Sequence, residues 1–466
     1  MDDHRNAARS IHDFATWEPV LRLVRASRAE RLAVPGGRVA GYIGRGGWSV
    51  PLRGGPPRSY RDEHDAVGRV RGALAEDGVD VVSFAVEVDP AGRTLLRILE
   101  YGPAVEPGVG PHPGALVLVE GALPRSWHRL PDAVPGAVPA PSADPALLER
   151  TLRERLPDAV GATEAEIAAA EARLGIALPD ELKALHRVTR ARWEDWQDDH
   201  EAARRHAAAV RCELFCLADL YVAEAATRYS PWQFAAMNAV DVRPDAVVQG
   251  LVGSPGWIVF GDNGGGDRLA VDLTPGPRGH TGQVIILSHE ESVGAGLVAD
   301  SLTDMMLDRR GRVESGPRGA DPRSVAVAWI NASNPRGLEA AVHPDLEVVS
   351  IGVWHDAPLG LAPLVGLPRL RTLTACPGTI ADPREIAGLT GLEYLELGPR
   401  DWRVLLDAGA VPRGLSAASI QAGHDEDPLP VADLADELLA LWDRPPITRT
   451  ILTGDLGPVA DGLGDP

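Results

Sequence analysis

Cysteine is scarce in this chain. Only Cys212, Cys216 and Cys376 occur among 466 residues, so a disulfide framework is excluded. Cys212 and Cys216 are four residues apart, which suits one face of a helix, but no further thiol completes a metal site beside them. Buried free thiols are the simpler interpretation. They are typical of a reducing compartment, and we expect a cytoplasmic protein.

Basic residues are also in deficit. Lys and Arg number 46 against 66 Asp and Glu, a formal net charge of −20. This charge repels nucleic acid and anionic lipid and attracts basic partners. The alternative interpretation is that the acidity only favours solubility. No uncharged apolar run reaches the roughly 18 residues of a membrane span. The opening MDDHRNAARSIHDF lacks the apolar core of a signal peptide. We expect neither nucleic acid nor membrane as a partner.

Signatures of catalysis are missing as well. The sequence contains no HExxH, no GxSxG and no paired CxxC motif. Its 13 histidines are scattered, and His200 and His206 are six residues apart, which does not place both rings on one helical face. We therefore predict a protein with no enzymatic activity, no cofactor and no metal. An enzyme whose site lies in the N-terminal segment is the alternative.

Proline and glycine divide the chain into three segments. Two stretches without periodicity, 131–146 and 309–323, predict linkers. The predicted domains are 1–130, 147–308 and 324–466. The first has an α+β pattern without an assignable function: helical spacing in 14–32 and 61–75, then strands in DVVSFAVEVDPAGRTLLRILEY and ALVLVEG.

The middle segment predicts helices followed by strands. Thr163 and Glu166 have the spacing of a capping box, and Gly175 marks the end of that helix. Pro179 begins a second helix, and a polar helical stretch reaches Arg211. Short strands are expected at 257–260, 268–273 and 283–287, and a closing helix at about 298–307.

The stretch WIVFGDNGGGDRLAVDL raises the question of a ligand loop. A phosphate loop needs a helix after its glycines, whereas here a second strand follows and no Lys accompanies the glycines. The positions of Asp262, Asn263 and Asp267 do not match the alternating ligands of a calcium loop. We interpret 261–267 as a hairpin turn, with a partner-contact loop as the alternative.

These motifs, in this order, resemble one family. The segment is similar to the SUKH superfamily, in its cell-wall-assembly-regulator branch. The similarity is carried by the motifs LGI-LP-DELK, W-I-VFGDNGGGD, RLAVDL, G-QVI and VADSLTDMM. The resemblance covers 163–307 and implies an α+β domain with a mostly antiparallel sheet and no enzymatic activity. Bacterial members are thought to be immunity proteins that neutralise nuclease or other toxins, and fungal relatives are scaffolds in cell-wall signalling. The long insertion 190–211, rich in Trp and acid, departs from the family pattern.

The C-terminal segment repeats an L-x-x-L-x-L pattern. The units begin at 325, 346, 370, 392 and 415, so their spacings are 21, 24, 22 and 23 residues. This period resembles leucine-rich repeats, although the usual Asn or Cys after the strand is missing. We predict a short α/β solenoid closed by a helix at 432–442, with a single small α/β domain as the alternative. The overall prediction is an α+β multidomain protein.

Two functions fit these patterns. The first is an immunity-type protein whose acidic surface binds and neutralises a basic toxin domain. The second is a scaffold or regulatory adaptor whose repeats recruit a host protein. The candidate partner-binding residues are the acidic residues of the insertion, Glu194, Asp195, Asp198 and Asp199, and the hairpin residues Asp262, Asn263 and Asp267.

Overall fold

The chain forms two compact units. The computed structural model describes residues 10–52, 57–108, 110–196, 199–240, 243–309, 325–333, 337–423 and 426–458. Met1–Ala122 and Ala328–Pro466 form one unit, here called the host unit, and Leu123–Val327 forms the other, the inserted unit. The N-terminal and C-terminal segments, predicted as separate domains, therefore share one unit.

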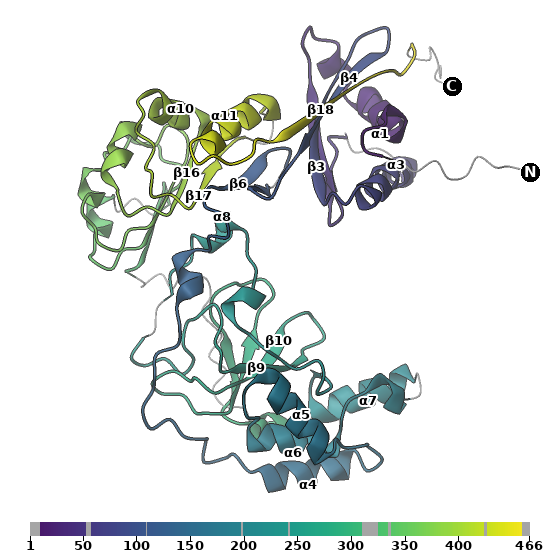
Figure 1. The fold of residues 1–466 in the computed structure, drawn as a ribbon, viewed down its shortest axis with the longest axis vertical. Coiled ribbons are helices and arrows are strands. Elements are labelled where there is room, and N and C mark those ends of the chain that lie inside the picture. Colours follow the sequence, from purple (N-terminus) through teal and green to yellow (C-terminus); the bar gives the residue numbers. More distant parts are fainter. Residues whose placement is uncertain are drawn as a thin grey trace, which may run out of the picture. The chain divides into compact units, whose positions relative to one another are not determined.

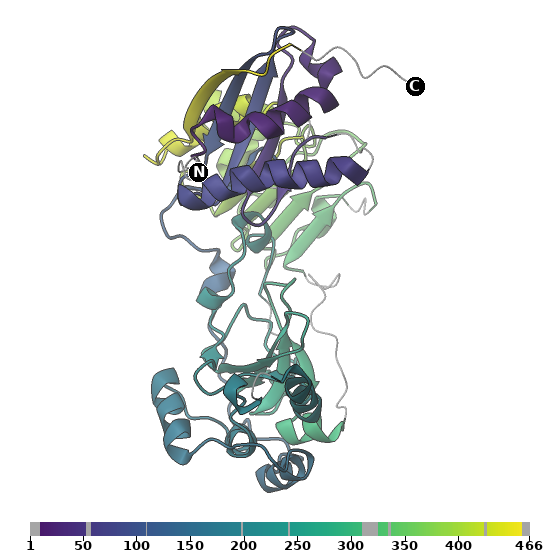
Figure 2. The same cartoon turned by 90° about the vertical axis from the view of Figure 1, so that its right-hand side faces the viewer.

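The first sheet of the host unit has helices on one face. Its order is β18-β4-β3-β1-β2, and its neighbouring strands are antiparallel. Alternate β3 and β4 residues, among them Phe84 and Leu96, share a core with helices that lie across the sheet (Figure 2). The elements are α1 (Phe14–Ser27), α2 (Ala29–Leu32), β1 (Val39–Gly44), β2 (Trp48–Ser49), α3 (Pro57–Glu76), β3 (Val81–Val88), β4 (Arg93–Glu100) and β18 (Thr448–Asp455).

The second sheet of the host unit contains the predicted repeats. Its order is β13-β14-β15-β16-β17-β6-β5, with β14 to β17 parallel and β6 antiparallel to β17. Its elements are β5 (Val105–Pro107), β6 (Pro113–Val117), β13 (Val327–Ile330), η4 (Glu339–Ala341), β14 (Val348–Ile351), η5 (Ala362–Leu364), β15 (Thr372–Ala375), η6 (Pro383–Gly388), β16 (Tyr394–Leu397), α10 (Pro399–Asp407), β17 (Ala417–Ile420) and α11 (Pro428–Ala440).

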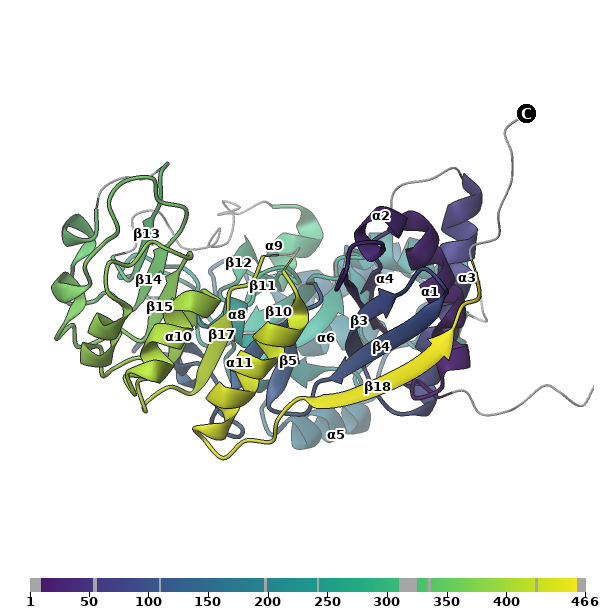
Figure 3. The ribbon, with the colours of Figure 1, turned by 90° about the horizontal axis from the view of Figure 1, so that it is seen from above.

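Two strand pairings explain why the outer segments share one unit. β18 pairs with β4 along its whole length, from Thr448 opposite Glu100 to Asp455 opposite Arg93 (Figure 3). β6 extends the repeat sheet beyond β17, and Leu116 and Leu118 enter the same core as the repeat leucines. Because these strand pairings join residues at least 300 positions apart, the local pattern did not indicate them.

The inserted unit is an antiparallel sheet with helices on one face (Figure 1). Strand β9 is buried along its whole length because Ile258 and Phe260 face the helices while Trp257 and Val259 face a second, smaller core. Its elements are η1 (Arg125–His128), α4 (Pro145–Arg155), α5 (Glu164–Leu174), α6 (Asp180–Val188), η2 (Trp193–Trp196), α7 (His200–Val210), β7 (Glu213–Leu214), β8 (Tyr221–Val222), η3 (Ala225–Thr227), α8 (Trp232–Ala235), β9 (Trp257–Asp262), β10 (Arg268–Asp272), β11 (Gln283–Leu287), β12 (Gly296–Ala299) and α9 (Leu302–Leu307).

Most predicted elements of the inserted unit are present. The capping box of Thr163 and Glu166 forms, and Gly175 ends α5 with a φ of 69°. The closing helix was expected from about 298, but 296–299 form strand β12 against β11, so α9 begins only at Leu302. Residues 131–146, predicted as a linker, pack against the inserted unit. The Asp132 N–H donates to Gln249 at 2.8 Å, and the Thr281 N–H donates to the Val138 carbonyl at 3.1 Å. The predicted linker 309–323 lies outside the described residues after 309.

Candidate functional site

The glycine hairpin 261–267 is held by its own polar side chains. Asp262 Oδ1 accepts from the N–H groups of Gly264 at 2.6 Å and Gly266 at 3.4 Å. Its other oxygen pairs with Arg268. Asn263 Oδ1 accepts from the N–H groups of Gly265 and Asp267. Gly264 and Gly266 have φ angles of 81° and 99°, which favour glycine. The acids of this loop are therefore used to form the turn.

Asp267 ties the hairpin to the loop after β11. Its Oδ1 accepts from the His289 N–H at 3.0 Å and lies 2.7 Å from His289 Nδ1, and its Oδ2 accepts from Asn263 Nδ2 at 2.9 Å. The backbone N–H of His289 is the main cause that lowers the pKa of Asp267 below its usual value. Of the three hairpin candidates, Asp262 is buried, Asp267 is half-buried and Asn263 is exposed.

The acids of the insertion have different environments. Asp195, in η2, accepts two hydrogen bonds from Arg190 Nε and one from Nη2, at 2.6 to 3.1 Å, and the hydrogen bond with Arg190 lowers the Asp195 pKa. Asp199 is exposed and caps α7 by accepting from the Glu201 N–H at 2.8 Å. Glu194 is exposed. Asp198 lies outside the described residues.

An exposed tryptophan stands beside these acids. The Trp193 side chain is 41% exposed, and its ring centroid lies 5.8 Å from that of Trp196 and 5.0 Å from that of His200. Trp196 in turn lies 5.1 Å from the ring of His206, whose Nε2 is 2.7 Å from Thr189 Oγ1. Burial lowers the pKa of His206 to about 4, so this ring is neutral at pH 7. The ring of Trp193 thus contacts two other aromatic side chains.

Trp193, Glu194 and Asp199 form what we call the tryptophan–acid cluster. The sequence prediction selected the acids and did not select Trp193, although the Trp-rich composition of the insertion was a usable signal. The cluster adjoins the start of α7, whereas β7, which pairs with the glycine hairpin, follows the end of that helix. Eleven residues of helix span about 16 Å, so the structure does not bring the two predicted acid groups together.

The remaining family motifs are joined inside the core. Asp272 of RLAVDL accepts from Trp257 Nε1 at 3.0 Å, from the Thr274 N–H at 2.8 Å and from Gln283 Nε2 at 2.9 Å. Burial raises the Asp272 pKa to about 6. Glu181 of LPDELK is buried and accepts from the N–H groups at the start of α9. These polar residues satisfy buried donors and build the fold.

The described residues contain no assembled metal site, and two of the three thiols have a raised pKa. No group of three or more His, Cys, Asp or Glu among them could hold a metal ion. Burial raises the pKa of the Cys212 thiol to about 12, and the Cys216 Sγ donates to Asp219 at 3.0 Å. Within the same residues, no helix combines the length and apolar composition that a bilayer crossing needs.

Comparison with known proteins assigns the middle of the chain. Residues 161–308 match the SMI1 / KNR4 family (SUKH-1), so the inserted unit carries a domain of this family. A "Glucan synthesis regulatory protein" of Neurospora crassa is 31% identical over 100 residues, covering 21% of this chain and 19% of that protein. A "KNR4/SMI1 homolog" of Yarrowia lipolytica is 42% identical over 50 residues, 11% of this chain and 7% of that protein. The matches thus span less than a fifth of either relative. The name of the Neurospora crassa relative describes regulation, and neither name mentions toxin immunity.

Proposed function

We propose that this chain is a non-enzymatic protein-binding regulator, and that its SUKH-1 domain docks a basic protein segment through the tryptophan–acid cluster. The observation that carries the proposal is the partly exposed Trp193, whose ring contacts those of Trp196 and His200 and which is flanked by exposed carboxylates. The regulatory role is supported by the fungal relative that is named a glucan synthesis regulatory protein.

The chemistry of the cluster favours a cationic partner. A Trp side chain offers a large contact area at a low cost in conformational entropy, and Trp is enriched at the residues that dominate interface energies. Its ring face attracts Lys and Arg, which the neighbouring Glu194 and Asp199 attract as well. The net charge of −20 adds long-range steering of a basic partner. Asp195 is already paired with Arg190 at 2.6 Å and contributes less to an incoming cation, whereas the exposed Asp199 has only a longer contact with Arg205, at 3.7 Å.

The repeat sheet supports a wider adaptor role. The leucines that open successive units, Leu346, Leu370, Leu392 and Leu415, are buried in one core, as stacked leucine-rich repeats require. We assign the segment to that repeat class within this proposal. Its sheet is extended by β6 from the N-terminal segment, so the repeats share a sheet and a compact unit with that segment.

An immunity-type role is the second candidate. The acidic charge that favours a basic partner would equally suit capture of a basic toxin such as a nuclease. The two candidates differ in the identity of the partner and share the docking surface.

The test is a quantitative pull-down with variants of the full chain. We expect Trp193→Ala, and the double reversal Glu194→Lys with Asp199→Lys, each to reduce the recovery of a specific partner by about tenfold or more. Phe234→Ala is the matched control because Phe234 is also an exposed aromatic residue of the inserted unit, at 53% exposure. Glu154→Lys with Asp158→Lys is the matched charge control, since both acids are exposed.

The outcome decides both parts of the proposal. A partner lost equally from the cluster variants and from the controls would show nonspecific charge attraction and overturn the docking site. Mass spectrometry of the specifically lost partner separates the functions: an endogenous regulatory protein supports the adaptor, and a toxin domain supports the immunity role.

A further inference from the structure

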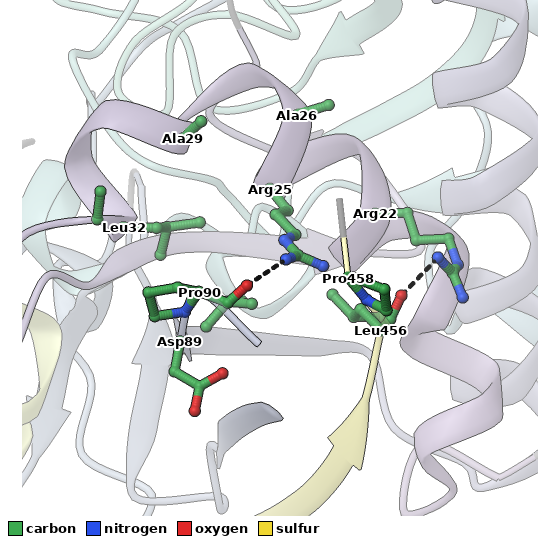
Figure 4. A pocket seen from close by; sticks show the side chains of 11 residues that line it. Arg22, Arg25, Ala26, Ala29, Leu32, Asp89, Pro90, Leu456 and Pro458 are labelled. Atoms are coloured by element: carbon green, nitrogen blue, oxygen red, sulfur yellow. Dashed lines mark hydrogen bonds between the residues drawn. The ribbon is translucent and has the colours of Figure 1, made fainter. Parts of the chain in front are cut away.

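A cavity of about 600 Å³ opens in the host unit, which does not contain the SUKH-1 domain. Three segments that are distant in sequence line it: the end of α1 with α2, the β3–β4 turn, and the chain just after β18 (Figure 4). The Leu456 N–H donates to the Gly92 carbonyl at 2.9 Å, which joins the last two segments. The volume of the cavity lies within the range of sites for small organic ligands, roughly 300 to 1,000 Å³.

The cavity has an apolar lining with an open rim. Leu32, Val88 and Leu456 are buried at its base, at 6%, 6% and 2% exposure. The side chains of Ala26 and Ala29 are exposed at the rim, so small methyl groups leave the space unfilled. An unfilled apolar surface of this kind favours an apolar group of a ligand over water.

One guanidinium in the wall has no carboxylate partner. Arg25 Nη1 donates to the Gly457 carbonyl at 2.5 Å, and Nη2 donates to the Pro90 carbonyl at 3.3 Å. No carboxylate pairs with it among the residues that the structure describes. Figure 4 shows this guanidinium between Pro90 and Pro458, directed into the space that the segments enclose. An arginine has five N–H donors, so Arg25 retains donors and a full charge for an anion.

The other charged groups of the wall are already paired. Arg22 donates to Glu18 at 2.7 and 3.0 Å and to the Leu456 carbonyl at 2.9 Å. The Asp89 carboxylate is bonded to Arg93 at 2.6 Å, and Figure 4 shows it directed away from Arg25. Arg25 is therefore the charge in the wall that is available to a ligand.

From this arrangement we infer that the cavity binds an amphiphilic carboxylate, with its apolar chain over Leu32, Val88 and Leu456 and its carboxylate on Arg25. The apolar lining excludes strongly hydrated anions, and the single available cation suits a single negative charge. This site is independent of the proposed docking cluster because it lies in the other unit.

Isothermal titration calorimetry of the full chain tests the site, with decanoate as the probe and decan-1-ol as the uncharged probe of equal length. We expect saturable binding of decanoate, and binding of decan-1-ol weaker by about tenfold or more, because a hydrogen bond to a charged group is lost. Arg25→Gln should weaken decanoate binding by a similar factor. Ala29→Phe should abolish it by filling the cavity.

Two matched variants keep the result interpretable. Arg22→Gln also removes an arginine that holds the chain after β18, but its charge is paired with Glu18, so decanoate affinity should change less than about threefold. Ala15→Phe places the same bulk on an exposed α1 position outside the cavity and should leave affinity unchanged. Absence of binding to the unmodified chain, equal affinity for decan-1-ol, or full binding by Ala29→Phe would each overturn the inference. Should Arg25→Gln fail to fold, the Ala29→Phe and Ala15→Phe pair still decides.

Discussion

The glycine hairpin and the tryptophan–acid cluster both contain acidic residues, and the environments of these acids differ. In the hairpin, Asp262 and Asp267 accept hydrogen bonds from the chain itself and have little capacity left for a partner. In the cluster, Glu194 is exposed beside an exposed Trp ring, while Asp199 is exposed and also caps α7. The difference shows that acid content alone does not locate a binding surface. The hydrogen-bond partners of each carboxylate decide whether it builds the fold or faces solvent.

The comparison predicts its largest stability effect at Asp272, the buried acid behind the hairpin. Asp272→Ala leaves Trp257 Nε1, the Thr274 N–H and Gln283 Nε2 without their acceptor. Unsatisfied buried donors cost about 1 to 3 kcal/mol each, and partial rearrangement limits the total, so we expect a loss of about 3 to 4 kcal/mol. Hydrogen exchange followed by mass spectrometry on β9 to β11 measures it. Asp158→Ala, at an exposed position, is the control and should change nothing.

Asp272 also predicts a pH dependence of that local stability. Its folded pKa is raised to about 6, above the unfolded value of about 3.9. The folded state therefore favours the protonated acid, and the stabilisation is present below pH 4 and is lost as the pH rises through 6. The shift of about 2 units corresponds to about 3 kcal/mol. Exchange protection of β10, corrected for intrinsic rates, should increase from pH 7 to pH 5. Asp272→Asn removes the titrating group, and a slope unchanged in that variant would contradict this cause.

At the hairpin itself we expect a smaller effect. Asp262→Ala removes the acceptor of the Gly264 and Gly266 N–H groups and the partner of Arg268. Asp262 is 6% exposed, so this loss should cost about 2 kcal/mol of local stability. Partner recovery in the pull-down should be unchanged once the protein is folded. Reduced recovery with unchanged exchange protection would instead identify the hairpin as part of the docking surface.

Local signals in the sequence predicted the elements whose stabilising contacts are made by residues close in sequence. The capping box at Thr163 and the hairpin turn at 261–267 are complete within a few residues, and both are present in the structure. Strand β18 was missed because its partner β4 lies about 350 residues earlier and its own burial is weak. β12 was taken for the start of a helix because the segment 298–307 has helical apolar spacing, while pairing with β11 decides its state.

The acidic composition of the candidate site was predictable from the sequence, but which of its acids are available to a partner was not. The acids of the insertion were visible in the sequence, yet nothing there distinguishes Asp195, which Arg190 binds, from the exposed Glu194. The value of Trp193 depends on its edge-to-face contact with Trp196 and its tilted contact with His200, which require the turn of η2. The cavity beside Arg25 needs three segments from both ends of the chain, so no local pattern could indicate it.

The smallest stability effects are expected at Asp195 and Glu194, two neighbouring acids in η2. Asp195→Ala removes the hydrogen bonds from Arg190, and since the Asp195 side chain is only 13% exposed, we expect a local loss of about 1 kcal/mol. Glu194→Ala removes an exposed carboxylate and should change local stability by less than about 0.5 kcal/mol. In partner recovery we expect the opposite order: Glu194→Ala should lose more partner than Asp195→Ala, because Glu194 is exposed while Asp195 is neutralised by Arg190. Hydrogen exchange of 190–196 and the pull-down, measured on the same two variants, test both orders. If Asp195→Ala lost the partner and Glu194→Ala kept it, the cluster would act through its fold alone, and the carboxylate contact would have to be abandoned.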